Sequence, residues 1–402
     1  MNILWETYDR LIKDLIPVYE RLDYGNYVMD ERLTGIVGQR GVGKTTYLLH
    51  YLKTNFPEGR QALYVSADHA WFTQNSLLDL VDRFYKDYDG KFLCIDEIHR
   101  YPNWNQELKN IYDSYPGLRL LFSGSSSIDL VKGHYDLSRR ALLYPMYGFS
   151  FREYLEKNLQ IRLAKYEFEE LIADHLVIES KLNVDKLLGH FKQYLKTGYY
   201  PFSEKFTSDQ RFYKSLQSII DKIIYQDIAS FYKLNTDSLL SVRKLLFYLA
   251  TTNPGEVNVN RLSSSLGRDN KTVGQYLQIL YETGLIRKLN TGQPGHALVR
   301  KPKKIYLENA NLLYCLANQL GMAVEVGTVR EIFAIGSLQQ VGKAVFYSRQ
   351  GDFICEGVTF EVGGKSKSKR QIKGVDDGLL LKDDILTGDK HALPLWLLGF
   401  LR

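Results

Sequence analysis

The sequence comprises 402 residues, of which 45% are hydrophobic and 24% charged, so it predicts a soluble globular protein of about two to four domains. Its formal net charge of +6, with an isoelectric point near 8.8, is compatible with a nucleic-acid partner but too small to require one. No apolar run approaches the roughly eighteen residues that a membrane-spanning helix needs, so we expect no membrane partner.

The first informative stretch is a glycine-rich loop between an apolar strand expected at residues 34–37 and a helix expected directly after the loop. Gly38, Gly43, Lys44 and Thr45 fit the pattern G-x-x-x-x-G-K-[ST]. Glycines let successive N–H groups point at one anion, and the helix adds the positive end of its dipole. We therefore predict a nucleoside triphosphate site. Its cofactor-binding residues would be Gly38, Gln39, Arg40, Gly41, Val42, Gly43, Lys44, Thr45 and Thr46. Within the loop, Lys44 would carry phosphate charge in catalysis and the Thr45 hydroxyl would ligate Mg²⁺.

Two carboxylates follow a later apolar strand. A second strand is expected at 62–66, and a third reaches Asp96 and Glu97. Asp96 would hold Mg²⁺ largely through its water shell, and Glu97 would polarise the attacking water. Strands also end in acidic residues for solubility, but the preceding loop favours the functional interpretation.

Two further candidates lie after the next helix, expected at 104–112. A strand at 118–123 runs into small polar residues, and ligands collect at the carboxyl ends of parallel strands. Ser123 is therefore our candidate γ-phosphate sensor, although the neighbouring serines could equally form a turn or a helix cap. Of two adjacent arginines, Arg140 is the better candidate to face phosphate charge. An ordinary solvent-exposed arginine is an equal alternative.

Four segments together resemble a prokaryotic family of AAA-type ATPases: GQRGVGKTT, LCIDEIHRYPNWNQELKNIYD, LLFSGSSSIDL and SRRALLYPMYGFSFREYL. Members join the ATPase to a winged helix and to a C-terminal domain resembling PD-(D/E)xK nucleases, and the similarity covers nearly the whole chain. The resemblance implies ATP as the nucleotide, since the sequence has no N/T-K-x-D guanine reader. This chain has Ser138-Arg139-Arg140 where relatives commonly have a Gly-Arg pair. The resemblance therefore does not identify which of the two arginines is the functional one.

The middle of the chain is helical in pattern. Residues 152–235 have helical spacing with a Gly/Pro break at Thr197–Phe202, and the resemblance implies a helical lid here. Helices are then expected at 241–250, 260–267 and 269–284, followed by strands at 285–289 and 304–307. This order predicts a helix-turn-helix with a wing.

The winged helix predicts contacts with double-stranded DNA. Side chains on the first turns of the recognition helix would reach base edges: Asn270, Lys271, Thr272 and Gln275. Basic residues by the wing suit phosphate contacts: Arg300, Lys301, Lys303 and Lys304. Winged helices also serve as protein-interaction modules, which is the alternative here.

The last hundred residues predict a helix at 328–333 and strands at 344–347, 352–354 and 358–362. A possible vestigial nuclease site comprises Glu331, Asp352, Glu361 and Lys365. Gly363 stands where the E-x-K pattern requires lysine, and Lys365 could replace it. We therefore expect a poor nuclease or none. The basic run 365–370 could instead hold a phosphate backbone or form a solvated loop. The apolar run 393–401 is expected to be a core strand.

These inferences give an α/β fold class. A P-loop NTPase core with a parallel sheet would span 1–155, a helical lid 156–236, a winged helix 237–307 and a restriction-nuclease-like α/β domain 308–402. The expected function is Mg²⁺-dependent ATP hydrolysis used as a switch on DNA. The alternatives are a nucleotide-regulated protein-interaction or signalling switch, and an active ATP-dependent DNA nuclease.

Cysteine usage indicates the compartment. Cys94, Cys315 and Cys355 lie far apart, in apolar surroundings and without C-x-x-C spacing. We therefore expect buried reduced thiols, no structural zinc and a cytoplasmic location. A homo-oligomer is compatible with the sequence.

Overall fold

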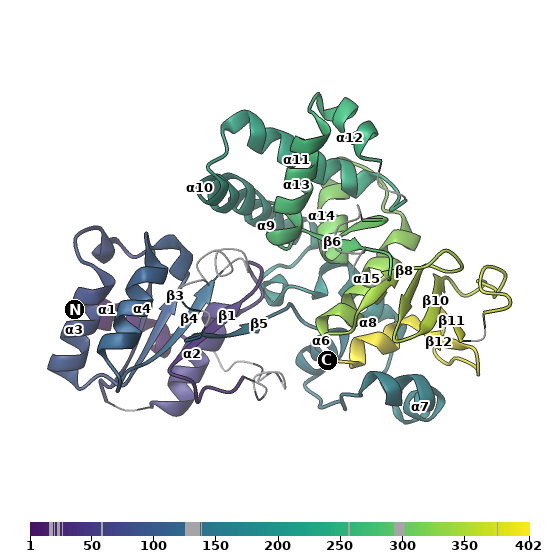
Figure 1. Ribbon diagram of the computed structural model, residues 1–402. Helices are drawn as coiled ribbons and strands as arrows, with labels where there is room; N and C mark the ends of the chain where they lie inside the picture. The colour runs from purple at the N-terminus through teal and green to yellow at the C-terminus, as the bar shows by residue number, and fades with distance from the viewer. Residues whose placement is uncertain are drawn as a thin grey trace. The chain divides into compact units, whose positions relative to one another are not determined.

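The computed structural model describes residues 1–15, 19, 21, 25, 27–57, 59–124, 137, 139–255, 258–292, 302–375 and 377–402. The chain divides into two compact units, Met1–Tyr147 and Gly148–Arg402 (Figure 1). Within the described ranges, no helix has both the length and the apolar character needed to cross a membrane.

The first unit is built on a five-stranded sheet with the order β2-β3-β4-β1-β5, in which every neighbouring pair is parallel. Its strands are β1 (Leu33–Val37), β2 (Ala62–Ser66), β3 (Phe92–Asp96), β4 (Arg119–Gly124) and β5 (Leu142–Pro145). Every residue of β1 and β3 is buried, because helices cover both faces of the sheet. That burial explains why these strands are near-continuous apolar runs in the sequence.

Helices flank this sheet on two sides. They are α1 (Asn2–Lys13), α2 (Lys44–Asn55), α3 (Leu77–Tyr88) and α4 (Trp104–Ser114), with short 3₁₀ turns η2 (Ala70–Thr73) and η3 (Ile98–Arg100). Helix α1 packs with α2, and α3 packs with α4. The connection from β1 to β2 crosses the sheet in the opposite direction to that from β2 to β3. Right-handed crossovers therefore place α2 and α3 on opposite faces. This is a mixed α/β unit consistent with a P-loop NTPase core.

The second unit begins with the helical region that the sequence predicted. Its helices are α6 (Phe151–Leu159), α7 (Phe168–Lys181), α8 (Leu187–Gln193), η4 (Tyr194–Gly198), η5 (Pro201–Lys205), α9 (Asp209–Lys222), η6 (Ile223–Ile228) and α10 (Ala229–Tyr232). Elements η4 and η6 are π-helical, and η5 is a 3₁₀ helix. Helix α6 is anchored by buried charge: Arg152 pairs with Glu156 at 2.8 Å, and its Nε donates to the backbone oxygen of Arg402.

Three helices and a strand pair follow in the predicted order. They are α11 (Thr236–Thr251), α12 (Val259–Leu266), α13 (Asn270–Glu282), β6 (Ile286–Leu289) and β7 (Lys304–Leu307). Strands β6 and β7 are antiparallel, and Gly284 turns the chain between α13 and β6 at a φ of 69°. Beyond β6, the backbone N–H of Tyr347 donates to the carbonyl of Asn290, so this hairpin joins the edge of the next sheet.

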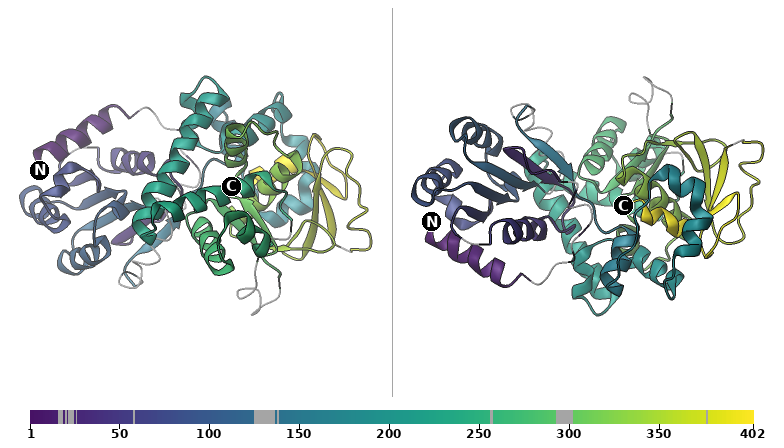
Figure 2. Two further views of the ribbon diagram at one scale, coloured as in Figure 1. Left: turned by 90° about the horizontal axis from the view of Figure 1, so that it is seen from above. Right: turned by 90° about the horizontal axis from the view of Figure 1, so that it is seen from below.

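The C-terminal part contains α14 (Ala310–Gln319), α15 (Val326–Gln340) and a five-stranded mixed sheet with the order β12-β11-β10-β9-β8. Its strands are β8 (Val345–Tyr347), β9 (Phe353–Cys355), β10 (Val358–Gly363), β11 (Gly378–Lys382) and β12 (Ala392–Pro394). Helix α15 packs on β10 and on the 3₁₀ helix η7 (Leu395–Phe400), which Figure 2 shows in yellow near the C-terminus.

One element differs from the sequence prediction. The run 393–401 is not a core strand, because β12 ends at Pro394 and η7 follows it. Every residue of η7 is buried, so its sequence is apolar on all sides. Such a run has no periodicity that distinguishes strand from helix.

Candidate nucleotide-binding site

The glycine-rich loop connects β1 to α2 with backbone conformations that require its glycines. Gly41 and Gly43 have φ values of 86° and 104°, in the left-handed region, and Gly43 is the N-cap of α2. A Cβ atom at Gly38 would lie 2.1 Å from the backbone oxygen of Met146. A side chain would therefore displace β5 or the loop at this point. The strand–loop–helix setting that the sequence predicted is confirmed.

Lys44 lies at the centre of this loop. Its Nζ donates to the carbonyl oxygens of Gly38 at 2.8 Å and Gln39 at 2.7 Å, and the residue is buried. The loop thus curves around an ammonium group at the N-terminal end of a 12-residue helix. Positive charge and the helix dipole act together there, which is an arrangement suited to an anion.

Asp96 lies at the carboxyl-end edge of the sheet and accepts several hydrogen bonds. Its carboxylate accepts hydrogen bonds from Thr45 Oγ1 at 2.6 Å, from the Tyr64 hydroxyl at 2.8 Å and from Ser123 Oγ. Burial, reinforced by the charge of Asp96, raises the pKa of Tyr64 well above its ordinary value, so its hydroxyl stays a proton donor. Hydroxyl and carboxylate oxygens are ligands that Mg²⁺ prefers, so Thr45 and Asp96 fit that ion.

Ser123 reaches this group because β4 lies between β1 and β3 in the sheet. Its Oγ also accepts a hydrogen bond from the backbone N–H of Glu97 at 3.0 Å. The same N–H lies 3.1 Å from Asp96 Oδ1. Ser123 therefore holds the backbone between Asp96 and Glu97 in place. The structure brings together Lys44, Thr45, Asp96 and Ser123 as the sequence suggested.

Glu97 projects from a strained backbone position just after β3. Its φ of 53° lies in the left-handed region, which is uncommon for a residue with a side chain. Three cationic or ionisable side chains surround its Oε2: Arg40 Nη2 at 3.0 Å, His99 Nε2 at 3.7 Å and Arg100 Nε at 3.9 Å. Of these three residues, only Arg40 was expected at the site, as part of the phosphate-binding loop.

Arg140 is not brought to this group. Its guanidinium forms a two-pronged ion pair with Asp113 of α4, with Nε–Oδ1 at 3.0 Å and Nη2–Oδ2 at 3.1 Å. Paired N–H···O bonds of this kind hold a guanidinium strongly, which opposes a role in contacting phosphate. Ser138, part of the departure from the family pattern, lies outside the described residues.

Comparison with known proteins agrees with this geometry. Residues 30–155 match a family described as AAA domain. The match supports an AAA-type ATPase. Residues 188–322, from α8 to just beyond α14, match a family described as a domain of unknown function (DUF8612).

A curated protein is similar over most of the chain. The uncharacterized protein MJ1637 of Methanocaldococcus jannaschii is 27% identical over 402 residues, covering 91% of this chain and 84% of the relative. Among solved structures, AMPPCP-bound DnaA from Aquifex aeolicus is 14% identical, covers 70% of this chain and 87% of its own, and has a TM-score of 0.28. A DNA replication initiation factor is 16% identical, covers 70% and 88%, and scores 0.26. TM-scores this low support no conclusion about fold or function.

In the second unit, helix α13 exposes polar side chains along one face. Lys271, Gln275 and Gln278 are exposed. Two neighbouring candidates have local partners instead: Asn270 Nδ2 donates to Asn260 Oδ1 at 2.7 Å, and the Thr272 hydroxyl donates to Asp269. Arg300 and Lys301, expected to contact phosphates, lie outside the described residues.

Lys304, which the sequence suggested as a phosphate contact, is paired with two carboxylates. Its Nζ lies 3.0 Å from Glu331 Oε2 and 3.4 Å from Asp352 Oδ1, and Tyr306 donates to the same Glu331 oxygen. Burial and the charge of Asp352 raise the pKa of Glu331. Among the described residues, no three His, Cys, Asp or Glu side chains are placed to hold a metal ion together. The chain's own lysine neutralises two of the three predicted carboxylates.

The third carboxylate, Glu361, is paired with a different lysine from the one expected. It is fully buried in β10, and its Oε1 pairs with Lys367 Nζ. A Cβ atom at Gly363 would lie 2.6–2.7 Å from the side-chain carbons of Lys367, so the missing side chain at 363 makes room for Lys367. Lys365 is exposed. The lysine that reaches Glu361 is therefore Lys367, two residues beyond the one that sequence reasoning favoured.

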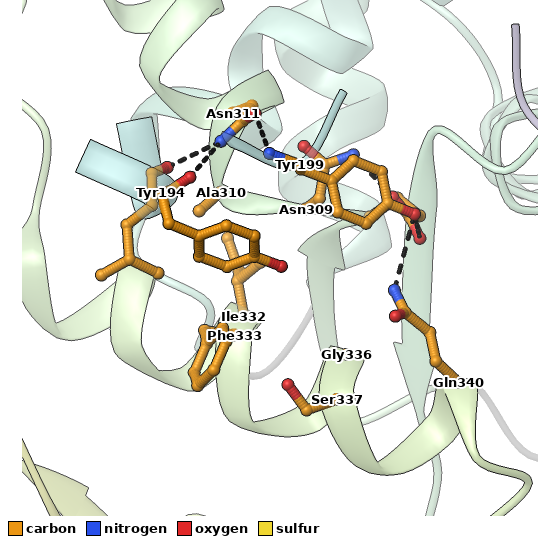
Figure 3. Close-up of a pocket in the computed structure, with 12 residues that line it drawn as sticks. Tyr194, Tyr199, Asn309, Ala310, Asn311, Ile332, Phe333, Gly336, Ser337 and Gln340 are labelled. Atoms are coloured by element: carbon orange, nitrogen blue, oxygen red, sulfur yellow. Dashed lines mark hydrogen bonds between the residues drawn. The ribbon is translucent and has the colours of Figure 1, made fainter. Parts of the chain in front are cut away.

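A small cavity in the second unit provides no rival nucleotide site. Its water-accessible volume is about 30 Å³, enough for water but not for a nucleotide. Figure 3 shows Tyr194, Tyr199 and Gln340 around it, and the Tyr199 hydroxyl lies 3.2 Å from Glu308 Oε1. Asn311 bonds to the carbonyls of Tyr194 and Leu195. The polar contacts around this cavity therefore connect η4 to α14.

Proposed function

We propose that the first unit binds ATP with Mg²⁺ and hydrolyses it to ADP. The observation that carries this proposal is the 2.6 Å hydrogen bond between Thr45 and Asp96. It joins the phosphate-binding loop directly to the acidic strand end. A glycine-rich turn with no nucleotide to bind would not need that connection.

Each group at the site has a role in this proposal. The loop N–H groups and Lys44 would bind the β- and γ-phosphates, and Thr45 and Asp96 would hold Mg²⁺. Bound Mg²⁺ would supply neutralising charge for the phosphates. Glu97 would accept a hydrogen bond from the attacking water and so orient it. Ser123 would hold the Glu97 backbone and sense the γ-phosphate from the neighbouring strand.

Equilibrium binding of ATP separates these roles. Lys44→Ala should lose nucleotide binding, because the loop loses the ammonium group at its centre. Glu97→Gln should bind ATP at least as tightly as the wild type, because the phosphate cradle is intact. Titration with a fluorescent ATP analogue measures both. Equal affinity of wild type and Lys44→Ala would contradict the assignment of the loop.

We further propose that the nucleotide controls DNA binding through α11–α13 and the β6–β7 hairpin, arranged as a winged helix. The exposed face of α13, with Lys271, Gln275 and Gln278, supports this second function, because polar side chains on a recognition helix can reach base edges. Replacing Lys271 by alanine should weaken duplex binding and reduce the salt slope by about one unit. Lys214→Ala on α9, also exposed, is the matched control.

The rival functions give different outcomes in the same salt titration. A protein-interaction switch predicts no salt-dependent duplex binding in wild type. An active nuclease predicts cleavage of the duplex in Mg²⁺. We propose that the C-terminal domain does not cleave, because Lys304 and Lys367 already pair with its three candidate carboxylates.

A further inference from the structure

We propose that Arg40 is a positioning residue that pairs with Glu97 until a nucleoside triphosphate draws its guanidinium to the γ-phosphate. The inference rests on the proposed ATPase function and deepens it. It gives the chain a means to distinguish a triphosphate from a diphosphate at the residue that activates water.

The geometry begins with the place of Arg40 in the chain. It lies inside the phosphate-binding loop, between Gly38 and Gly41, yet its Nη2 is 3.0 Å from Glu97 Oε2. The side chains of Arg40 and Glu97 are only 15% and 21% exposed, so water screens this pair less than an open surface pair. One guanidinium therefore links the loop that would hold phosphates to the carboxylate that would orient water.

The backbone around Glu97 fixes where its carboxylate can go. Its N–H bonds to Ser123 and Asp96, and its φ of 53° is held by those contacts. The remaining freedom lies in the side chain of Glu97, whose Oε2 lies 3.0 Å from Arg40 Nη2. His99 and Arg100 lie farther away, at 3.7 and 3.9 Å, beyond hydrogen-bonding distance.

The chemistry favours an exchange of partners. A carboxylate that accepts from a guanidinium is a poorer acceptor for a water proton, because its charge is already neutralised. A γ-phosphate carries more negative charge than a carboxylate and matches the planar guanidinium fork. Once Arg40 turns to that phosphate, Glu97 can accept from water. A diphosphate offers no γ-phosphate, so the Arg40–Glu97 pair would persist.

A double-mutant cycle tests the exchange without measuring turnover. The proteins are wild type, Arg40→Ala, Glu97→Gln and the double variant, titrated by calorimetry with ADP and with a non-hydrolysable ATP analogue in Mg²⁺. Arg40→Ala should weaken analogue binding about tenfold and leave ADP affinity nearly unchanged. Glu97→Gln should tighten analogue binding several-fold, because the phosphate no longer competes with Glu97, and this gain should vanish in the double variant.

The controls separate positioning from folding. Arg40→Lys should retain part of the preference for the analogue, and Arg100→Ala, which removes a cation outside the loop, should leave that preference unchanged. Unchanged thermal unfolding of each variant shows an intact fold. Equal losses for ADP and analogue in Arg40→Ala, or the same effect of Glu97→Gln with and without Arg40, would overturn the exchange. A wild type that binds neither nucleotide would overturn the proposed ATPase as well.

Discussion

At the scale of single residues, the candidate site depends on how Asp96 is held. Three hydroxyl groups, from Thr45, Tyr64 and Ser123, donate to one carboxylate that is 3% exposed. Each donor comes from a different element: α2, β2 and β4. The acidic group is thus oriented before any ligand arrives, which lowers the cost of assembling a metal site.

Tyr64→Phe should loosen Asp96 while leaving its charge in place. The variant removes one hydrogen bond to a carboxylate, so the free energy of unfolding should fall by about 1–2 kcal/mol. The Mg²⁺ concentration for half-maximal hydrolysis should rise, because Asp96 loses a group that orients it. Urea unfolding and a Mg²⁺ titration measure the two effects. An unchanged Mg²⁺ requirement would show that the Tyr64 contact does not matter to the site.

The three cysteines should be unreactive in the native protein. All three are buried and free; burial raises the pKa of Cys315 and of Cys355 to about 12 and that of Cys94 well above its ordinary value. At pH 8 few native thiols are ionised, and only the thiolate is nucleophilic. Alkylation by iodoacetamide should therefore be slow until urea unfolds the chain.

The raised pKa values of the three thiols also make the stability of the fold depend on pH. Unfolded thiols ionise near pH 9, before the native ones, so stability should decline as the pH rises above about 9. Urea unfolding at pH 7.5 and 10 checks this. Rapid labelling of one native cysteine at pH 8 would contradict its burial.

At the scale of elements, Lys304 joins strand β7 to the C-terminal sheet. Lys304→Met should leave Glu331 and Asp352 close together without a cation, so unfolding free energy should fall by about 2–3 kcal/mol. Adding Glu331→Gln and Asp352→Asn should recover much of that loss, because no uncompensated charge remains. Differential scanning calorimetry measures both variants. Stability equal to wild type in Lys304→Met would show that the pair is not structural.

The same elements show what a sequence can and cannot predict. The loop at Gly38–Thr45 and the strand end at Asp96 follow from local pattern, because strand, turn and helix signals lie within a few residues. Lys367 contacts Glu361 because the chain reverses beyond Gly363. Arg140 pairs with Asp113, which lies on a helix distant in the sequence. Such pairings depend on tertiary placement, so single-sequence patterns do not contain them.

Tyr64, and the contact of Arg40 with Glu97, were not predicted for a related reason. Tyr64 lies two residues before the end of β2, so alternation places it on the same face as Ser66, whose register partner is Asp96. A hydroxyl side chain two residues before the end of β2 is the sequence signal that indicates this contact. Arg40 was noted only as part of a loop, because its contact with Glu97 requires knowledge of the strand order.

At the scale of the whole molecule, nucleotide and DNA binding must be coupled for the switch to work. If DNA changes the affinity for an ATP analogue by some factor, the analogue must change the affinity for DNA by the same factor. We expect a factor of about five or more in the Glu97→Gln variant, which binds without turnover. Fluorescence titrations of each ligand with and without the other measure it. Affinities that do not respond to one another would leave an ATPase without a DNA switch.

Single-turnover hydrolysis of radiolabelled ATP measures most directly whether the first unit cleaves ATP through Glu97. The wild type should form ADP in Mg²⁺ and not in EDTA. Glu97→Gln should bind the same ATP and cleave it about 10²–10⁴ times more slowly, because the attacking water loses its acceptor. Wild-type protein that binds ATP without forming ADP, or Glu97→Gln that cleaves at the wild-type rate, would contradict hydrolysis through Glu97.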